Sequence, residues 1–261
     1  MTPRTFLPDL TRSARRRADE AARNHATWRA AVTDAPAPLD FRGALVGDGL
    51  AVIAEAKQQS PSKGRLAGDD YDAGLLAREY ERAGASAMSV LTEPDFFLGR
   101  LSHLAAARER SGLPLLRKDF LLEPAQVAEA RAFGADAVLA IVRILRDEEL
   151  ASLIEAARQY GIAVLVEVHN AAELERALAA GAELIGVNNR DLDTFETRLE
   201  RCLDLASQIP DGVTTVAESG IRTPDDIRAV RAAGYQAALI GEQFMVSGTG
   251  LMEAASQWLR R

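Results

Sequence analysis

Three ionisable side chains have the types and positions that acid–base chemistry needs. Lys57 follows Glu55 by two residues, and Lys118 and Glu167 each lie just after a stretch of apolar residues. Partial burial and close neighbours move the pKa of a lysine down and that of a glutamate up, toward the neutral range where both transfer protons efficiently. These residues predict acid–base catalysis, provided that the fold brings them together.

Further polar residues follow other apolar stretches and suit an anionic substrate. Asn188 and Arg190 come after one such stretch, and Glu218 ends another. Because strand side chains alternate in direction, Asn188 and Arg190 are expected to point the same way while Asn189 points away. Cations beside carboxylates would hold an anionic molecule while the carboxylates handle protons.

Glycines that follow two of the apolar stretches indicate a phosphate site. Ser219 and Gly220 follow the seventh apolar stretch, and Gly241 follows the eighth. Loops after the last two strands of an eight-stranded barrel often bind phosphate through backbone N–H groups, which glycine lets approach closely. Ser60 begins a polar stretch, residues 60–69, that is either a connector or a lid adding Ser60 to the phosphate site.

The elements that must position these residues alternate regularly along the chain. Short, almost continuously apolar runs are separated by amphipathic helical segments, and glycines such as Gly134 and Gly181 end the helices. Runs of this kind are typical of parallel strands that are covered on both faces. The eight runs are residues 50–54, 87–91, 113–116, 137–142, 162–166, 184–187, 213–217 and 237–240.

This pattern predicts an α/β fold, a (β/α)8 TIM barrel with an extra N-terminal helical segment. We expect one domain over residues 1–261, with a helical extension at 1–48 and the barrel at 49–261. An open doubly wound sheet is the alternative, but the first strand lacks the glycine-rich fingerprint expected there. Residues 4–31 are expected to form one surface helix, with the basic run 12–17 on its solvated face.

Composition narrows the function classes. The chain has 261 residues, a net charge of −7 and a single cysteine, Cys202. The negative charge argues against nucleic-acid binding, and one cysteine cannot form an internal disulfide or a zinc cluster. Neither a membrane-spanning run nor a signal-peptide core is expected, so we predict a cytoplasmic protein. His169 is expected to pack or cap the loop after Glu167, and no residue set has metal-ligand spacing.

Taken together, these short sequence segments resemble the indole-3-glycerol-phosphate synthase family of tryptophan biosynthesis. The combination of Glu-x-Lys-x-x-Ser-Pro-Ser with Lys-Asp-Phe is highly specific, and the similarity keeps the family's order. The matching segments are residues 53–64, 89–93, 116–120, 165–169, 186–192, 217–221 and 239–242.

The resemblance implies a cofactor-free lyase that closes an indole ring, releasing carbon dioxide and water from 1-(2-carboxyphenylamino)-1-deoxyribulose 5-phosphate. It implies Lys118 as general acid, Glu167 as partner acid/base, and Lys57 as a catalytic residue that contacts the substrate's anionic groups and shares the acid role. The residues implied to orient the substrate are Glu55, Asn188, Arg190 and Glu218. The residues implied to surround the phosphate are Ser60, Ser219, Gly220, Gly241 and Glu242, the last through its backbone. Candidates for an apolar slot around the aromatic ring are Phe96, Phe97, Phe120 and Leu192.

Three alternatives remain open at this point. A homologue from secondary metabolism that acts on a substituted anthranilate derivative would carry the same sequence motifs. Another sugar-phosphate barrel enzyme, such as an aminoaldose–ketose isomerase, would need a carboxylate with a cysteine or aspartate partner, and Cys202 is placed in a helix. A non-catalytic phosphate-binding barrel would not need the acid–base set. We expect a monomer, with a weak homodimer as the alternative, and no metal.

Overall fold

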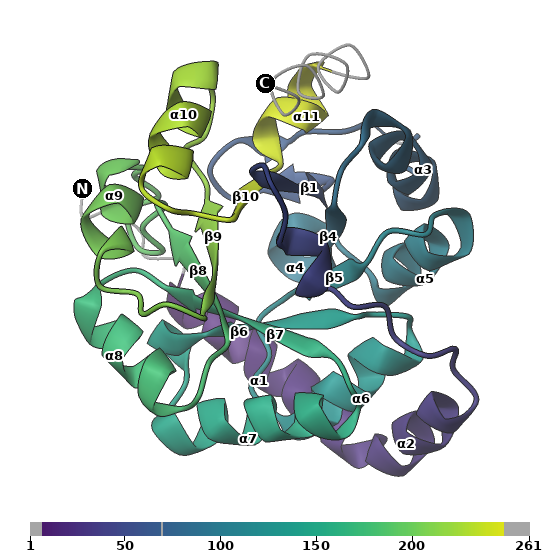
Figure 1. The fold of residues 1–261 in the computed structure, drawn as a ribbon. Coiled ribbons are helices and arrows are strands. Elements are labelled where there is room, and N and C mark those ends of the chain that lie inside the picture. Colours follow the sequence, from purple (N-terminus) through teal and green to yellow (C-terminus); the bar gives the residue numbers. More distant parts are fainter. Residues whose placement is uncertain (1–6, 69, 248–261) are drawn as a thin grey trace, which may run out of the picture.

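A closed barrel of eight parallel strands forms the centre of the computed structural model, which describes residues 7–68 and 70–247 (Figure 1). Around the barrel the hydrogen-bonded order is β1-β10-β9-β8-β7-β6-β5-β4. The barrel prediction is confirmed, and the open-sheet alternative is wrong because β1 pairs with β10 as well as with β4. The barrel strands are β1 (Ala51–Ala56), β4 (Ala87–Leu91), β5 (Leu115–Lys118), β6 (Ala137–Ile141), β7 (Ala163–Val168), β8 (Leu184–Asn188), β9 (Thr214–Glu218) and β10 (Ala237–Ile240).

Several strands run one or two residues further than their apolar runs. Lys118 pairs with Leu91 across β4 and β5, and Glu167 pairs with Ile141 across β6 and β7. Asn188 and Glu218 are partners in the last register position of β8 and β9. These polar residues therefore stand at the ends of paired strands rather than in the loops that follow, and the strand pairing fixes their backbones.

The helices surround the barrel and begin and end where the local signals place them. Asn170 accepts a hydrogen bond from the backbone N–H of Glu173 at 2.9 Å, and Thr223 caps its helix in the same way, with Pro224 as first helical residue. The helices after β1 are α3 (Ala73–Ala83), α4 (Pro94–Phe97), α5 (Leu101–Arg110), α6 (Pro124–Ala132), η2 (Val142–Ile144), α7 (Asp147–Gln159), α8 (Ala171–Ala179), α9 (Glu200–Ala206), α10 (Pro224–Ala232) and α11 (Glu242–Ser247).

The N-terminal segment differs from the prediction of one surface helix. It forms two helices, α1 (Leu7–Arg23) and α2 (His25–Thr33), separated at Asn24. One face of α1 is buried, including Leu10 and Ala14. Both helices pack on α6, and the rings of Trp28 and Phe133 lie 5.9 Å apart.

One arginine of the basic run points inward, which corrects the prediction that the whole run is solvated. The guanidinium of Arg17 donates to Glu93 at 3.1 Å and to Asp119 at 2.8 Å. Both carboxylates are buried, so each needs a cationic or hydrogen-bonding partner. Arg12 is solvated as predicted, with 75% of its side chain exposed.

After α2 the chain passes to the opposite end of the barrel, where β1 starts. The backbone N–H of Leu39 donates to Asp136 just before β6, and Arg42 pairs with Glu183 just before β8. Phe41 and Leu45 are buried there, Leu45 at the end of the short helix η1 (Gly43–Leu45). The N-terminal segment thus contacts both ends of the barrel.

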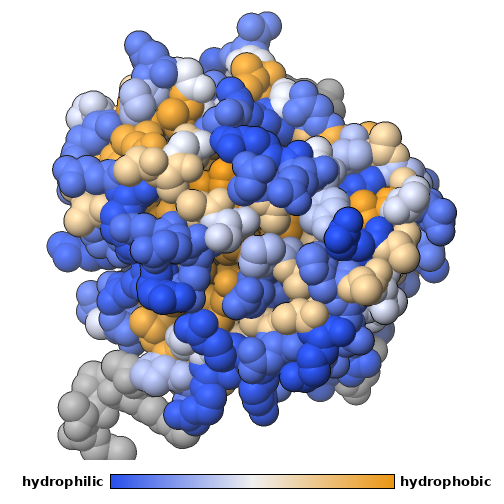
Figure 2. Space-filling model, turned by 90° about the horizontal axis from the view of Figure 1, so that it is seen from below, coloured by the Kyte–Doolittle hydropathy of each residue, from blue (hydrophilic) through white to orange (hydrophobic). Residues whose placement is uncertain are grey.

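The remaining surface is largely hydrophilic on the face that Figure 2 shows, where hydrophobic groups occur in small groups between polar ones. Large exposed hydrophobic residues among those described, such as Leu75 and Leu203, belong to different elements. None of the helices in residues 7–68 and 70–247 combines the length and apolar composition that spanning a membrane requires.

Substitution of Arg17 by methionine should lower the free energy of unfolding by about 2 kcal/mol, because it leaves two buried carboxylates short of a partner. Urea denaturation at neutral pH, followed by circular dichroism, measures this change. Arg12→Met is the matched control on the same helix and should leave the midpoint unchanged. Equal midpoints for the two variants would contradict the inward role of Arg17.

Candidate active site

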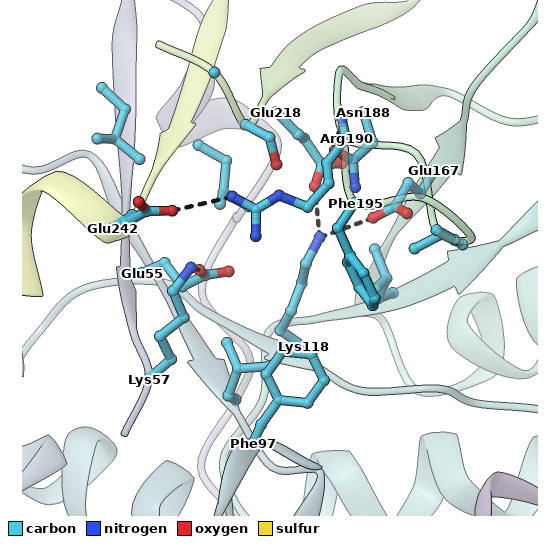
Figure 3. A pocket seen from close by; sticks show the side chains of 18 of the residues that line it. Glu55, Lys57, Phe97, Lys118, Glu167, Asn188, Arg190, Phe195, Glu218 and Glu242 are labelled. Carbon is cyan, nitrogen blue, oxygen red and sulfur yellow. Dashed lines mark hydrogen bonds and ion pairs between the residues drawn. The ribbon is translucent and has the colours of Figure 1, made fainter. Parts of the chain in front are cut away.

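A cavity opens at the carboxyl ends of the barrel strands, and it collects most of the predicted site residues (Figure 3). It has polar residues from β1, β5, β7, β8 and β9 around a partly apolar wall. The predicted residues that line it are Glu55, Lys57, Lys118, Phe120, Glu167, Asn188, Arg190, Leu192, Glu218, Ser219, Gly220, Gly241 and Glu242.

Lys118 lies at the centre of the charged cluster. Its Nζ is 2.9 Å from Oε2 of Glu167 and 2.5 Å from Oε2 of Glu218, and all three side chains point into the cavity (Figure 3). Only 12% of the Lys118 side chain is exposed, and the two carboxylates are almost fully buried. The contact with Glu218 joins β5 to β9, across the barrel mouth.

A second ion pair lies on β1 and just beyond it. Nζ of Lys57 is 2.5 Å from Oε1 of Glu55, as the spacing of two residues predicts. The hydroxyl of Tyr80, in α3, donates to the backbone carbonyl of Glu55 at 3.2 Å and anchors this strand end. Glu55, Glu167 and Glu218 therefore share one cavity with Lys57, Lys118 and Arg190.

The pKa of Lys118 is raised, whereas the sequence predicts that partial burial and close neighbours lower it. Burial alone would lower it, but the negative charges of Glu167, Glu218 and Glu55 raise it above its ordinary value. Burial likewise favours a neutral Glu167, but Lys118 and His169 hold the pKa of Glu167 below its ordinary range. In both cases the neighbouring opposite charges outweigh desolvation: the carboxylates around Lys118, and the cationic groups beside Glu167.

The pKa of Glu218 is raised, as the sequence predicts for a glutamate in this site. Burial, together with the neighbouring charges of Glu167 and Glu55, raises the pKa of Glu218 to about 7 despite its contact with Lys118. A carboxyl group with this pKa exchanges protons at neutral pH.

Two glycines make room for these carboxylates. A Cβ at Gly186 in β8 would lie 2.0 Å from Oε1 of Glu218, and a Cβ at Gly241 would lie 2.5 Å from Oε1 of Glu55. Sequence reasoning missed Gly186 and assigned Gly241 to phosphate alone. A glycine inside a strand is itself a signal for such a close approach.

Arg190 and Glu242 connect three loops at the rim of the cavity. The backbone N–H of Arg190 donates to Oδ1 of Asn188, which orients both side chains, while Asn189 points away and donates to the Ser219 carbonyl. The Arg190 guanidinium donates to Glu242 at 3.0 Å. Lys63 adds an ion pair to the other carboxylate oxygen of Glu242. The side chain of Glu242, and not only its backbone, therefore faces cationic groups.

Aromatic and aliphatic side chains form one wall. The rings of Phe97 and Phe120 lie 6.3 Å apart, and Leu192 and Phe195 also line the cavity. Sequence reasoning missed Phe195, which lies in the loop after β8 with a positive φ of 58°. Phe96, also predicted for this wall, is half-buried against the core and is not among the lining residues. This wall therefore gives apolar surface to the same cavity as the charged cluster.

Ser60 is not brought to this cavity. It is buried in the short hairpin of β2 (Gln59–Ser60) and β3 (Gly64–Arg65), and its hydroxyl has no hydrogen-bond partner. Cys202 lies in α9, where its thiol donates to the Val187 carbonyl at 3.3 Å and burial raises its pKa to about 12. It is therefore not placed to act as an acid in this cavity.

Within the described residues, no group of three or more histidine, cysteine, aspartate or glutamate side chains is arranged to hold a metal ion. The closed barrel carries a lysine–carboxylate cluster at its carboxyl-terminal mouth, an arrangement of groups that is typical of α/β-barrel enzymes and chemically suited to proton transfer.

Comparison with known proteins identifies the family. The model of the family described as indole-3-glycerol phosphate synthase matches residues 11–253, and the chain belongs to this family. It is 50% identical over 222 residues to the indole-3-glycerol phosphate synthase of Roseiflexus castenholzii, which covers 82% of each chain. The synthase of the same name from Mycobacteroides abscessus is 47% identical over 236 residues, or 89% of this chain and 86% of the relative.

More distant solved structures share the fold alone. The 3-hexulose-6-phosphate synthase from Salmonella typhimurium superposes with a TM-score of 0.65 at 12% identity, over 81% of this chain and 99% of the other. Thiamine phosphate pyrophosphorylase from Pyrococcus furiosus gives a TM-score of 0.60 at 16% identity, over 85% and 96% of the two chains.

The carboxyl group of Glu218 should titrate with a midpoint of about 7, as its environment dictates. Carbon-13 NMR of the glutamate carboxyl groups, assigned with a Glu218→Gln variant, measures this midpoint. Lys118→Met should raise it further, because the substitution removes the cation that stabilises the ionised form. A midpoint at the ordinary value of a glutamate, or a fall in the Lys118 variant, would disprove the electrostatic description.

Proposed function

We propose that the protein is an indole-3-glycerol-phosphate synthase that converts 1-(2-carboxyphenylamino)-1-deoxyribulose 5-phosphate to indole-3-glycerol phosphate, carbon dioxide and water. The family membership assigns the reaction class, a carboxy-lyase. The observation that carries the assignment of roles is the contact of the Lys118 ammonium with both Glu167 and Glu218 at the wall of one cavity. The reaction needs a proton donor and a proton acceptor on the same substrate carbons.

The anionic ends of the substrate have two sets of partners. Ser219, Gly220 and Gly241 line one side of the cavity, where their backbone groups suit a phosphate. Lys57 and Arg190 supply positive charge for the substrate carboxylate and the sugar oxygens. In this proposal Ser60 joins the phosphate site only if its hairpin shifts, because Ser60 is buried within the hairpin.

Lys118 starts the reaction as general acid. The ring carbon that bears the carboxylate attacks the ketone carbon, a carbon–carbon bond forms, and the ketone oxygen takes the proton from Lys118. Loss of carbon dioxide leaves its electron pair in the ring and restores aromaticity. Substrate that enters between Lys118 and its carboxylates weakens their stabilisation of the ammonium, and the pKa of Lys118 falls toward a useful range.

Glu167 completes the reaction as base. The new hydroxyl must leave as water, and the neighbouring carbon must lose a proton so that the double bond of the indole forms. Glu167 is ionised below neutral pH and takes this proton, while the hydroxyl leaves with a proton from Lys118. Glu218, with a pKa of about 7, returns a proton to Lys118.

The site is contained in one chain, because every group named above comes from the same barrel. We infer that the enzyme acts as a monomer in the cytoplasm. Among the residues that the structure describes, the large exposed hydrophobic side chains are few, and this supports a monomer, since a stable interface needs a continuous apolar patch; they are Leu39, Val46, Leu75 and Leu203.

The purified protein should convert the carboxyphenylamino substrate to a product with indole fluorescence. Lys118→Met should lower kcat by about a thousandfold, because general acid catalysis of this kind contributes about 10² to 10⁴. A fluorescence assay under saturating substrate measures the change, with circular dichroism to show that the variant is folded. Absence of product from the wild-type protein, or near-normal turnover by the variant, would refute the proposal.

Gly186→Ala should also reduce kcat, by about tenfold or more, since displacing a reacting group by about 1 Å costs up to a hundredfold. The added methyl group collides with Glu218 and pushes its carboxylate away from Lys118. Gly47→Ala is the matched control, because a Cβ at Gly47 meets nothing within 4 Å. The same assay compares the two, and equal turnover in both folded variants would show that Glu218 does not need its present position.

A further inference from the structure

A buried histidine stands directly behind Glu167, on the side away from Lys118. Nε2 of His169 lies 3.4 Å from Oε1 of Glu167, and the imidazole is only 2% exposed. The opposite oxygen of Glu167, Oε2, contacts Lys118. Neither Nε2 of His169 nor Oε1 of Glu167 has a hydrogen-bond partner, although both atoms are buried. Two unpartnered polar atoms therefore face each other.

The other face of the imidazole is firmly held. Nδ1 of His169 is 3.0 Å from Oε2 of Glu173 in the first turn of α8, and the backbone N–H of His169 donates to the same oxygen at 2.8 Å. Asn170 donates to Oε1 of Glu173 at 2.8 Å. Because the carboxylate of Glu173 accepts these bonds, it keeps a proton on Nδ1 and fixes the plane of the ring.

This geometry favours the protonated, positively charged form of the His169 imidazole. With Nδ1 protonated, a neutral imidazole would turn the lone pair of Nε2 toward a carboxylate oxygen at 3.4 Å, which is repulsive. A second proton on Nε2 changes this repulsion into a charge-assisted attraction. The ring between Glu167 and Glu173 is thus arranged to be an imidazolium.

The surrounding charges favour the same state. Burial opposes the charge on His169, but the hydrogen bond that its ring donates to Glu173 and the negative charges of Glu167 and Glu173 raise the pKa of His169, against a smaller opposing effect of Arg201 in α9. Lys118 in β5 and His169 both lower the pKa of Glu167.

Glu167 has two further polar neighbours, which come from β8 and β9. Glu218 in β9 is the acidic group beside Glu167 within the cavity, and the side-chain amide of Asn188 in β8 also lowers the pKa of Glu167. Neither Glu218 nor Asn188 carries a positive charge, so neither replaces the charge that His169 supplies to Glu167.

We propose that His169 is a positioning residue for Glu167: held by Glu173, its imidazolium orients the Glu167 carboxylate and keeps it ionised while Lys118 is engaged with substrate. This inference rests on the proposed function, in which Glu167 is the base. During the reaction the ammonium that stabilises Glu167 turns to the ketone oxygen, and the charge of His169 then holds Glu167 deprotonated. Glu167 can therefore accept the proton that completes the indole.

The test compares His169→Gln with His169→Ala in the fluorescence assay across pH. Glutamine keeps an amide donor near the position of Nε2 but carries no charge, and alanine removes both. The acidic limb of the kcat profile should move upward by about one pH unit in both variants, because an adjacent cation lowers a carboxyl pKa by about that much or more. His169→Ala should lose a further tenfold or so in kcat, which glutamine recovers, while KM changes little.

A second measurement does not depend on activity. Carbon-13 NMR should show the titration midpoint of the Glu167 carboxyl rising in His169→Gln. His103→Gln is the matched control, since His103 lies in α5 outside the cavity, 5.1 Å from the ring of Tyr71, and should shift neither the profile nor the midpoint.

The outcomes separate the two proposals. An unchanged Glu167 midpoint with an unchanged acidic limb, whatever the loss of rate, would overturn the role of His169 and reduce it to packing. A raised midpoint in a protein whose wild type makes no indole product would support the positioning role and overturn the proposed function instead.

Discussion

A buried ammonium shared by two carboxylates is the interaction on which the rest of the site depends. Burial opposes the charge of Lys118, and its contacts with Glu167 and Glu218 offset that cost, as Lys118 in turn offsets part of the cost of burying the two carboxylates. Each partner comes from a different strand, so the contact exists only when the barrel is closed and in register. Gly186 and Gly241 then follow as necessities, because a side chain at either position would occupy the volume of a carboxylate.

The outside of the same strand end is held by a second buried network. Alternation along β5 turns Lys118 inward and its neighbours Arg117 and Asp119 toward the helices. Asp119 accepts hydrogen bonds from Arg117, from Thr92 and, across the surface, from Arg17 of α1. The N-terminal extension is therefore connected by one residue to the strand that carries the proposed acid, and this connection explains why a helix outside the barrel bears an arginine that turns inward.

The loops at the mouth are linked through charges that a substrate can use. Arg190 and Lys63 both contact the Glu242 carboxylate, so an anionic side chain balances the cations of the rim. In the proposed function, the anionic groups of the substrate would bring their own negative charge to the same cavity. Binding would then exchange one anion for another at these cations, which costs less free energy than leaving the cations unpaired.

Local patterns in the sequence by themselves determined the barrel, its helix caps and the strand ends at which charged residues would meet. They did so because burial on both faces and parallel pairing leave few other uses for eight apolar runs, and because all parallel strands end at the same side. Only the tertiary structure decided that Glu218 contacts Lys118, that Arg17 turns inward, that Ser60 stays away from the cavity and that His169 backs Glu167. Those relations depend on stagger and side-chain direction between segments far apart in the chain, and no local spacing encodes them.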